Sequence, residues 1–384
     1  MKFKYYATLP PGLEKISSDE IEELGGRIFR IKEGKGRIFF EGDFELIPKV
    51  NYLSRTIERT IILLKLEEFE NITLDDIYKS VYEIDWTEWI REEQAFAIRP
   101  LRAGEHDFTS IDVGRVAGQA VIDAYKNAKG VRLKVNLDNP DVIIRVDVIF
   151  NELIIGIDTT GDEGLHRRGY RAYNHPAHLN ASIASALVKL SNWKDDEILL
   201  DPMCGSGTIL VEAAMIKRNI PPGKFRDDFA FIKIFGREAL DEIKSQIVEN
   251  KKMLKLYGVE KFKKHISGAV KNAENVGVVD TIKFIEGDAT ELEKIDYLKD
   301  GVDVVITNPP YGIRIGGKKM VRNLYNNFLN SLKKITHDDS RIIIITAEDK
   351  ILRNAAINNN YKIKEEFRVM YGGLDTVVFV LKNE

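Results

Sequence analysis

The stretch LLDPMCGSGTILVEAA, residues Leu199 to Ala214, decides the fold of the second half of the chain. An apolar run ends at Asp201, Gly205 and Gly207 follow, and a helical pattern begins directly after them. Glycine lets the backbone approach a ligand closely, and the amino end of a helix favours a negative group. The stretch therefore predicts a strand, a ligand-binding loop and a helix, in that order.

This loop differs from the two common nucleotide-binding fingerprints. No lysine followed by serine or threonine comes after the glycines, as a Walker loop requires, and the glycine spacing is not G-x-G-x-x-G. Asp201 would also repel a pyrophosphate, because both carry negative charge. An aspartate at this place suits a ligand with a cation or an amine, and it disfavours a dehydrogenase.

Strand and helix patterns alternate on both sides of the loop. From about Asn174, a helix at residues 177–190 precedes a strand at 197–200, and a helix at 208–218 follows the loop. Such alternation predicts a doubly wound parallel sheet. Helical segments separate its further strands, which are predicted near Leu256, Ile282, Val302, Arg341 and Thr376.

Polar residues follow the strands of this predicted sheet. LYGVE ends at Glu260, FIEGDAT holds Asp288, and VVITNPPYG holds Asn308. Asp288 lies 28 residues after Glu260 and 20 residues before Asn308, and each distance suits one strand and one helix. IFGRE, with Glu238, competes for the end of the second strand but would leave a much longer unit. Ligands bind at the carboxyl ends of strands in such sheets, so we expect a site there.

Taken in order, DPMCGSGT, GVE, GDA and NPPY resemble the motifs of class I S-adenosylmethionine-dependent methyltransferases that methylate amines, over roughly residues 174–384. DPMCGSGTILVEA, together with the first half, is similar to the THUMP-domain RNA guanine-N2 methyltransferases, which act on tRNA or ribosomal RNA. The resemblance implies transfer of a methyl group from S-adenosyl-L-methionine to the N2 amino group of a guanosine, with guanosine 6 of tRNA as the first choice.

The resemblance also implies a role for each motif. Asp201 would face the methionine amine, Glu260 the ribose and Asp288 the adenine of the cofactor. The chain departs from the family at residues 179–182, where relatives often carry a Leu-Lys-Glu-Thr type of stretch. The other cofactor-binding residues implied are Leu179, Ser182, Cys204, Gly205, Ser206, Gly207, Thr208, Ala289 and Asn308.

TNPPYGIR, residues Thr307 to Arg314, would carry the chemistry. Proline has no N–H and cannot continue a sheet, so the strand must stop at Asn308. The Asn308 side-chain oxygen and the Pro309 carbonyl can accept the two hydrogens of the guanine amine, and Pro310 stiffens the segment. Tyr311 can stack on the flipped base. Positioning would supply most of the catalysis, without a metal, a covalent nucleophile or a strong general base.

The first half has a different pattern. Its strands, predicted at 37–41, 60–66, 95–101, 142–150 and 152–158, do not alternate strictly with the helices predicted at 73–82 and 112–126, which indicates an α+β fold. The resemblance implies a ferredoxin-like part and a THUMP RNA-binding module in residues 1–165 and a linker at 166–176. A Rossmann-like α/β methyltransferase domain with a self-contained sheet would follow at 177–384.

RNA affinity has to come from local charge, because 57 basic and 60 acidic residues leave a net charge of −3. The linker arginines could instead form a solvated face. The basic candidates for RNA contact lie in the first half, in the linker and beside NPPY: Arg99, Arg102, Arg115, Lys126, Lys129, Arg132, Arg167, Arg168, Arg171, Arg314, Lys318, Lys319 and Arg322.

The remaining composition restricts the cellular compartment and the kinds of site that the chain can hold. Cys204 is the single cysteine, which excludes an internal disulfide and a cysteine-based zinc site and favours a reducing compartment. No apolar stretch is long enough to cross a membrane. His166, His175 and His178 are close in sequence but lack a carboxylate pattern for metal binding. Together with the resemblance, these observations lead us to expect a cytoplasmic, monomeric enzyme with tRNA as its partner and with no need of a metal or a membrane.

Other functions stay open on the sequence alone. Guanosine 10 of tRNA, ribosomal RNA guanine and adenine N6 are alternative targets, and protein glutamine amide methylation also uses Asn-Pro-Pro-Tyr. An RNA-gripping first half argues against the glutamine substrate. A base C5 methyltransferase would need Cys204 as its nucleophile, but this residue lies in the cofactor loop. A non-catalytic RNA-binding protein is disfavoured by the intact set of Asp201, Glu260, Asp288 and Asn308.

Overall fold

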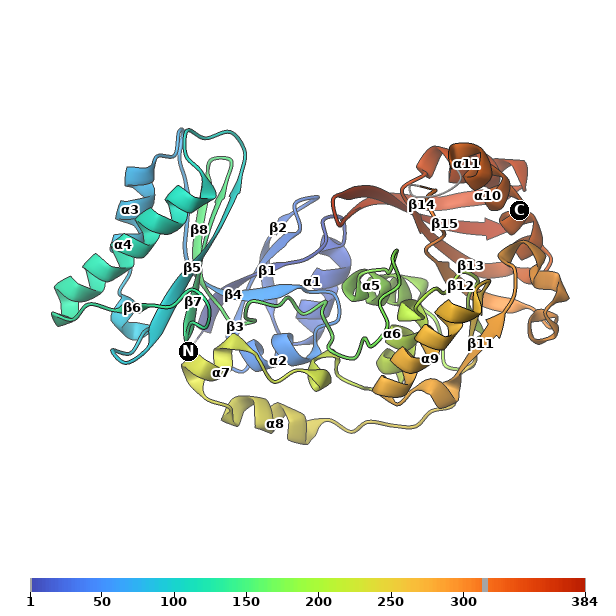
Figure 1. Cartoon of the computed structure of the whole chain (residues 1–384), viewed down its shortest axis with the longest axis horizontal. Coiled ribbons are helices and arrows are strands. Elements are labelled where there is room, and N and C mark those ends of the chain that lie inside the picture. Colours follow the sequence, from blue (N-terminus) through green and yellow to red (C-terminus); the bar gives the residue numbers. More distant parts are fainter. Residues whose placement is uncertain (1, 313–316, 384) are drawn as a thin grey trace.

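The computed structural model of the chain describes residues 2–312 and 317–383. Two sheets carry its fold, one in each half of the sequence (Figure 1). Among the helices of these described ranges, none is both long and apolar enough to cross a membrane.

The first sheet has eight strands in the order β2-β3-β1-β4-β8-β7-β5-β6. β4 joins the two parts of this sheet, because it pairs antiparallel with β1 on one side and with β8 on the other. β-branched residues fill strands such as VIIRVDVI of β7, since they pack well on a pleated surface. The strands are β1 (Lys2–Thr8), β2 (Arg27–Lys32), β3 (Arg37–Asp43), β4 (Arg59–Glu68), β5 (Ala95–Ala103), β6 (Lys134–Val135), β7 (Val142–Ile149) and β8 (Glu152–Asp158).

Four helices pack on this sheet. They are α1 (Glu14–Glu23), α2 (Leu46–Leu53), α3 (Leu74–Tyr82) and α4 (Ser110–Lys129). Thr73 and Thr109 cap α3 and α4, and each accepts a hydrogen bond from an aspartate N–H three residues later while that aspartate side chain accepts from the threonine N–H. The helices predicted at 73–82 and 112–126 are therefore confirmed, with α4 longer at both ends.

The second sheet has seven strands in the order β11-β10-β9-β12-β13-β15-β14. β9 to β13 run parallel, but β15 is antiparallel to both β13 and β14, so the prediction of a wholly parallel sheet is wrong at this edge. The reason is the turn at Gly372 and Gly373, where both residues have positive φ and close a tight hairpin. The strands are β9 (Leu199–Asp201), β10 (Leu256–Glu260), β11 (Ile282–Glu286), β12 (Val302–Thr307), β13 (Thr336–Thr346), β14 (Tyr361–Tyr371) and β15 (Leu374–Asn383).

Helices connect the strands of this second sheet. α5 begins at Ala181 rather than at residue 177, because the Asn180 side chain accepts a hydrogen bond from the Ser182 N–H (2.8 Å) and caps the helix there. The helices are α5 (Ala181–Ser191), α6 (Thr208–Lys217), α9 (Lys263–Val276), α10 (Gly317–Lys333) and α11 (Asp349–Asn358).

The segment between α6 and β10 leaves the second half and runs along the first half (Figure 1). It carries α7 (Ala230–Phe235) and α8 (Glu238–Gln246). The Phe231 N–H donates to the Thr159 carbonyl (3.0 Å), and the Phe235 ring meets the Phe44 ring edge-on, with 5.1 Å between centroids. The seven strands thus form a sheet of their own, but this segment depends on the first half for its packing.

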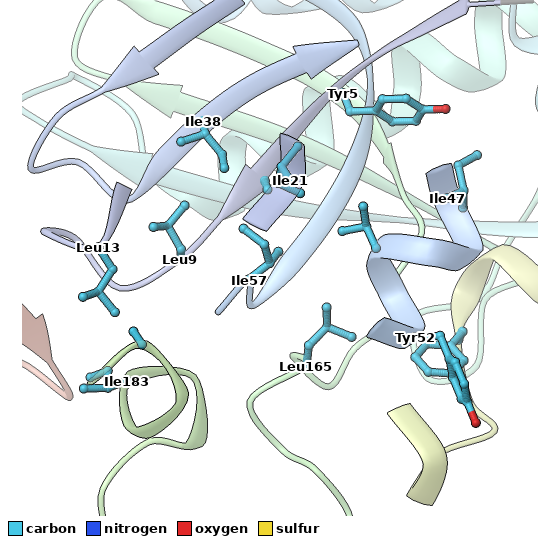
Figure 2. Close-up of a cluster of buried hydrophobic side chains, with 14 of the residues drawn as sticks. Tyr5, Leu9, Leu13, Ile21, Ile38, Ile47, Tyr52, Ile57, Leu165 and Ile183 are labelled. Atoms are coloured by element: carbon cyan, nitrogen blue, oxygen red, sulfur yellow. The ribbon is translucent and has the colours of Figure 1, made fainter. Parts of the chain in front are cut away.

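Buried side chains of the two halves form one continuous core. Leu13, from the first half, and Ile183, from α5, belong to the same buried cluster, together with Leu165 of the connecting segment (Figure 2). The Arg55 guanidinium donates to the Ile220 carbonyl (2.8 Å) across the same boundary. The β14–β15 hairpin adds a further contact, in which the Met370 N–H donates to the carbonyl of Pro11 (3.0 Å).

Candidate active site

Four polar residues come together at the carboxyl edge of the parallel strands. Asp201 ends β9, Glu260 ends β10, Asp288 comes two residues after β11, and Asn308 follows β12 directly. The strand pairing places Asp201 beside Gly258 and Glu260 beside Glu286, so these chain ends share one edge. The choice of Glu260 as the residue that ends the second strand is confirmed, because Glu238 begins α8 instead.

Asp201 is buried at the centre of this edge. Its Oδ1 atom accepts hydrogen bonds from the Met203 N–H (3.2 Å) and from the Thr307 hydroxyl (2.9 Å). Burial, with a smaller contribution from nearby Glu260, raises the pKa of Asp201 to about 7. A cation beside this carboxyl group would therefore have a large effect on its ionisation.

Glu260 bridges two loops of the site. One carboxylate oxygen accepts from the Gly205 N–H (3.2 Å), and the other accepts from the Phe262 N–H (3.0 Å). Gly205 and Gly207 have positive φ, a conformation that residues with a side chain rarely adopt. The loop therefore depends on glycine at both positions, and at Gly207 an added Cβ would also press against Phe284 (3.1 Å) and Ala269 (3.2 Å).

Cys204 packs beneath this loop. Its side chain is buried, and burial raises the pKa of the thiol well above its usual range, with Asp201 and Glu260 adding to the effect. A thiol that resists ionisation is a poor nucleophile. The side chain therefore serves packing, as Cys204 also lies against Gly258, where an added Cβ would come within 3.0 Å of its sulfur.

Asp288 has the opposite electrostatic setting. The Lys261 ammonium donates to its Oδ2 (2.8 Å), and the Thr290 N–H (2.9 Å) and hydroxyl (2.8 Å) donate to its Oδ1. These donors, Lys261 first, lower the pKa of Asp288 to about 2 against the opposing effect of partial burial. Ala289, the next residue, is buried.

Asn308 to Tyr311 leave the sheet as predicted, and β12 stops at Thr307. The Tyr311 hydroxyl donates to the Asn308 side-chain oxygen. Pro309 is buried, and the Pro310 carbonyl accepts from the hydroxyl of Tyr325 on α10 (3.2 Å). Tyr325 was not predicted from the sequence, but a tyrosine on the apolar face of an amphipathic helix signals a buried hydroxyl that needs a partner.

Leu179 and Ser182 flank the start of α5, and both are buried. The Leu179 carbonyl (3.2 Å) and the Thr208 hydroxyl (3.3 Å) both accept from the Arg171 guanidinium. Arg171 was predicted to contact RNA, whereas these partners place it beside the glycine-rich loop. Ser206, also predicted to bind cofactor, is buried and shares a hydrogen bond with the Thr208 hydroxyl (3.3 Å).

The prediction that Arg168 contacts RNA is wrong. The residue is 3% exposed, and its guanidinium pairs with Glu212 of α6 at 3.3 Å between Nε and Oε1. Glu212 also accepts from the hydroxyls of Tyr170 (3.1 Å) and Ser185 (2.6 Å). Arg168 thus neutralises a buried carboxylate at the junction of the halves, because a buried charge needs a partner.

The other basic residues predicted to contact RNA differ in their exposure and in their hydrogen-bond partners. Arg99 pairs with Asp162 (2.8 Å), and the half-buried Arg102 donates to the Gly104 carbonyl (2.9 Å). Arg314 lies outside the described residues. The exposed candidates are Arg115, Lys126, Lys129, Arg132, Arg167, Lys318, Lys319 and Arg322.

The histidines near the linker do not converge on a metal site. His175 meets His265 edge-on, with 4.3 Å between ring centroids, and His166 lies 3.6 Å from a Glu58 oxygen. Across residues 2–312 and 317–383, no group of three or more His, Cys, Asp or Glu side chains could hold a metal ion.

Comparison with known families decides the assignment of the chain. The RMKL-like methyltransferase domain matches residues 168–376, the THUMP domain residues 71–158 and the RlmL ferredoxin-like domain residues 4–61. The chain belongs to the RMKL-like methyltransferases. The predicted order of a ferredoxin-like part, a THUMP module and a methyltransferase domain is thereby confirmed for this RMKL-like enzyme.

Two similar relatives and one solved structure extend nearly over the whole RMKL-like chain. The tRNA (guanine(6)-N2)-methyltransferase of Methanocaldococcus jannaschii is 65% identical over 98% of this chain and 99% of the relative. The tRNA (guanine(6)-N2)-methyltransferase of Archaeoglobus fulgidus is 49% identical over 98% of this chain and 91% of the relative. The crystal structure of SMU.472 complexed with SAH has a TM-score of 0.85 at 26% identity, and the match covers 100% of this chain and 98% of that chain.

Proposed function

We propose that this enzyme transfers a methyl group from S-adenosyl-L-methionine to N2 of guanosine 6 in tRNA. The observation that carries the proposal is the 65% identity, over almost the full length, to a tRNA (guanine(6)-N2)-methyltransferase. The THUMP domain at residues 71–158 supports a structured RNA as substrate.

The residues at the edge of the second sheet fit the proposed cofactor. Asp201 is a buried carboxyl group whose pKa is raised by burial, and an adjacent amine cation would favour its charged form. Glu260 presents two oxygens that suit a pair of ribose hydroxyls, and Asp288 with Ala289 would adjoin the adenine. When bound, S-adenosyl-L-methionine supplies an electrophilic methyl group.

Asn308 and Pro309 would orient the guanine amine. Their two oxygens would accept its two hydrogens and aim the nitrogen lone pair toward the methyl group. The Tyr311 hydroxyl already donates to the Asn308 oxygen, but an amide oxygen has two lone pairs, so it can hold this donor and the amine together. Tyr311 would then stack on the base from a fixed position.

We infer a narrower set of tRNA contacts from the exposure of the basic residues. We propose Arg115, Lys126, Lys129, Arg132, Arg167, Lys318, Lys319 and Arg322 as phosphate contacts, because all of them are exposed. Arg99 and Arg102 can join them after they exchange their present partners. We assign Arg171 to the cofactor site instead, where its guanidinium would hold Leu179 and Thr208 in place through hydrogen bonds. The divisions at 1–165, 166–176 and 177–384, the cytoplasmic location and the monomeric state stay predictions.

Nucleoside mass spectrometry tests this proposal. The full chain is incubated with S-adenosyl-L-methionine and three tRNA transcripts: one with guanosine at positions 6 and 10, and two in which one of these guanosines is replaced together with its pairing partner. N2-methylguanosine should form in the first transcript, vanish when position 6 is replaced and persist when position 10 is replaced. Methylation that survives replacement of guanosine 6, or that appears on adenine, would contradict the proposal.

A further inference from the structure

Two buried hydroxyl groups form hydrogen bonds on either side of the proposed amine acceptors, Asn308 and Pro309. Thr307 precedes Asn308, and its hydroxyl donates to Asp201 Oδ1 (2.9 Å). Tyr325 lies on α10, and its hydroxyl donates to the Pro310 carbonyl (3.2 Å). Both residues are 0% exposed, so neither hydroxyl can exchange its partner for bulk water.

The segment needs such anchors because its prolines remove the usual ones. Pro309 and Pro310 have no N–H, so these two residues cannot donate to a neighbouring strand. Only carbonyls and side chains remain available to fix them. The two buried hydroxyls supply one contact before Asn308 and one after Pro309.

The Tyr325 hydroxyl has a defined direction. The Glu348 N–H donates to Thr346 Oγ1 (3.0 Å), and Thr346 Oγ1 lies 2.8 Å from the Tyr325 hydroxyl. Tyrosine has a single hydroxyl proton, and the bond to Pro310 uses it, so the Thr346 hydroxyl donates to Tyr325. The hydrogen bonds therefore run from the Glu348 N–H through the hydroxyls of Thr346 and Tyr325 to the Pro310 carbonyl.

Thr307 links the two ligand sites. Its hydroxyl is a side-chain donor from β12 to the carboxyl group that ends β9, and the residue that follows it is Asn308. Its hydrogen bond stabilises the charged form of Asp201 and so lowers the pKa of that group, against burial. The other titratable groups beside Asp201 are Glu260 on β10 and Cys204 in the loop.

We propose that Thr307 and Tyr325 are positioning residues of the methyl-transfer site, and that Thr307 couples the cofactor carboxylate to the amine acceptor Asn308. This inference rests on the proposed roles of Asp201 and Asn308. Thr307 fixes the near side of the acceptor pair and sets the charge of Asp201. Tyr325 fixes the far side through the Pro310 carbonyl.

The test of Tyr325 compares two tyrosines with similar environments. Tyr325→Phe removes the bond to Pro310, while Tyr361→Phe removes a bond from a buried tyrosine to the Leu329 carbonyl (3.0 Å), on the same helix α10. Both variants should lose similar stability in urea. Only Tyr325→Phe should lower kcat for tRNA methylation, by about 10- to 100-fold for one misplaced acceptor, with KM for tRNA and the Kd of S-adenosylhomocysteine unchanged. Equal kcat in the two variants would overturn the role of Tyr325.

The test of Thr307 has a readout that needs no turnover. The Kd of S-adenosylhomocysteine is measured by calorimetry from pH 6 to pH 8.5 for the natural chain, Thr307→Val and Thr307→Ser. Binding of the ligand's amine should strengthen as Asp201 ionises, and loss of the Thr307 donor should move the midpoint of this change to higher pH. Thr307→Ser keeps the donor and should restore the midpoint. An unchanged midpoint in Thr307→Val would overturn the coupling.

A matched control separates this effect from general loss of packing. Thr376 is also 0% exposed, and its hydroxyl donates to the Val369 carbonyl (2.5 Å) in the β14–β15 hairpin. Thr376→Val should leave the pH midpoint and kcat unchanged. If the natural chain methylates a different RNA amine, the proposed substrate fails, yet the pH midpoints and the kcat ratios measured on that RNA still decide the roles of Thr307 and Tyr325.

Discussion

Asp201 and Asp288 follow parallel strands at the same edge of one sheet, yet their surroundings differ. Asp201 is 2% exposed, and burial raises its pKa to about 7. Asp288 has a side chain 30% exposed beside Lys261, and the pKa is lowered to about 2. Asp201 is buried, with a hydroxyl and an amide as its donors, and we call its surroundings the dry end of the site. Asp288 is partly exposed to solvent, with an ammonium partner, and we call its surroundings the wet end.

Because of this difference, we expect the two ends of the site to contribute differently to function. At the β9–β12 end, Asp201 and Asn308 accept hydrogen bonds from neutral donors, among them the Thr307 hydroxyl. A cationic ligand group would supply the missing countercharge of Asp201. At the β10–β11 end, Glu260 accepts from two backbone N–H groups, and Asp288 already has the Lys261 ammonium as a charged partner. Changes at the first end should therefore affect turnover and both the strength and the pH dependence of ligand binding, whereas changes at the second should mainly affect affinity and surface stability.

The largest effect is expected from Asn308→Ala. This change removes an acceptor that is used mainly in the transition state, so kcat should fall by about 100- to 1,000-fold. The Kd of S-adenosylhomocysteine and the binding of tRNA should stay the same. Single-turnover methylation of tRNA measures the loss, and Asn326→Ala on α10 serves as the control. Substantial single-turnover activity of Asn308→Ala would remove the acceptor role.

Asp201→Asn is expected to have the next largest effect. At pH 8 the natural carboxyl group is ionised and can pair with the amine of the ligand, so its loss should cost about 3 kcal/mol of S-adenosylhomocysteine binding. Since the raised pKa of Asp201 is about 7, the natural chain should bind more weakly at pH 6 and the variant should show a flat profile. Calorimetry at these two pH values checks the sign. A pH dependence that is equally steep in the variant would assign the titration to another group.

The motif residues show which parts of the site could be predicted from the sequence. Asp201, Glu260, Asp288 and Asn308 lie at one sheet edge because each stands at the carboxyl end of a parallel strand, and alternating strand and helix patterns reveal those ends. The sequence could not show that Arg168 is buried, because its partner Glu212 lies 44 residues further along the chain. β15 was predicted near Thr376, but β14 was missed, although the turn at Gly372 and Gly373 that joins the two strands is a local signal. The α7–α8 segment was missed because contacts with the distant first half define its place.

Glu260→Ala should weaken cofactor affinity by about 1 to 3 kcal/mol, the cost of losing hydrogen bonds to a charged acceptor. Glu238→Ala is the matched control, because this glutamate begins α8 on the segment that runs along the first half. Calorimetry with S-adenosylhomocysteine should show the loss for the first variant only. The opposite order would mean that the ribose site lies elsewhere.

The smallest effect is expected from Lys261→Met at the wet end. The Lys261–Asp288 pair is exposed and screened by solvent, so the free energy of unfolding at pH 7 should fall by only about 0 to 1 kcal/mol. Because the folded pKa of Asp288 is lowered from the unfolded value of about 4, its stabilising contribution is present above pH 4 and is lost as the pH falls through about 2. The deficit of the variant, measured from urea midpoints, should therefore shrink between pH 4 and pH 2.5. Lys299→Met breaks another exposed pair, with Asp296, and should cost similar stability without touching S-adenosylhomocysteine binding. A deficit that grows as the pH falls would show that Lys261 does not act through Asp288, and the contrast between the dry and the wet end would then rest on Asp201 alone.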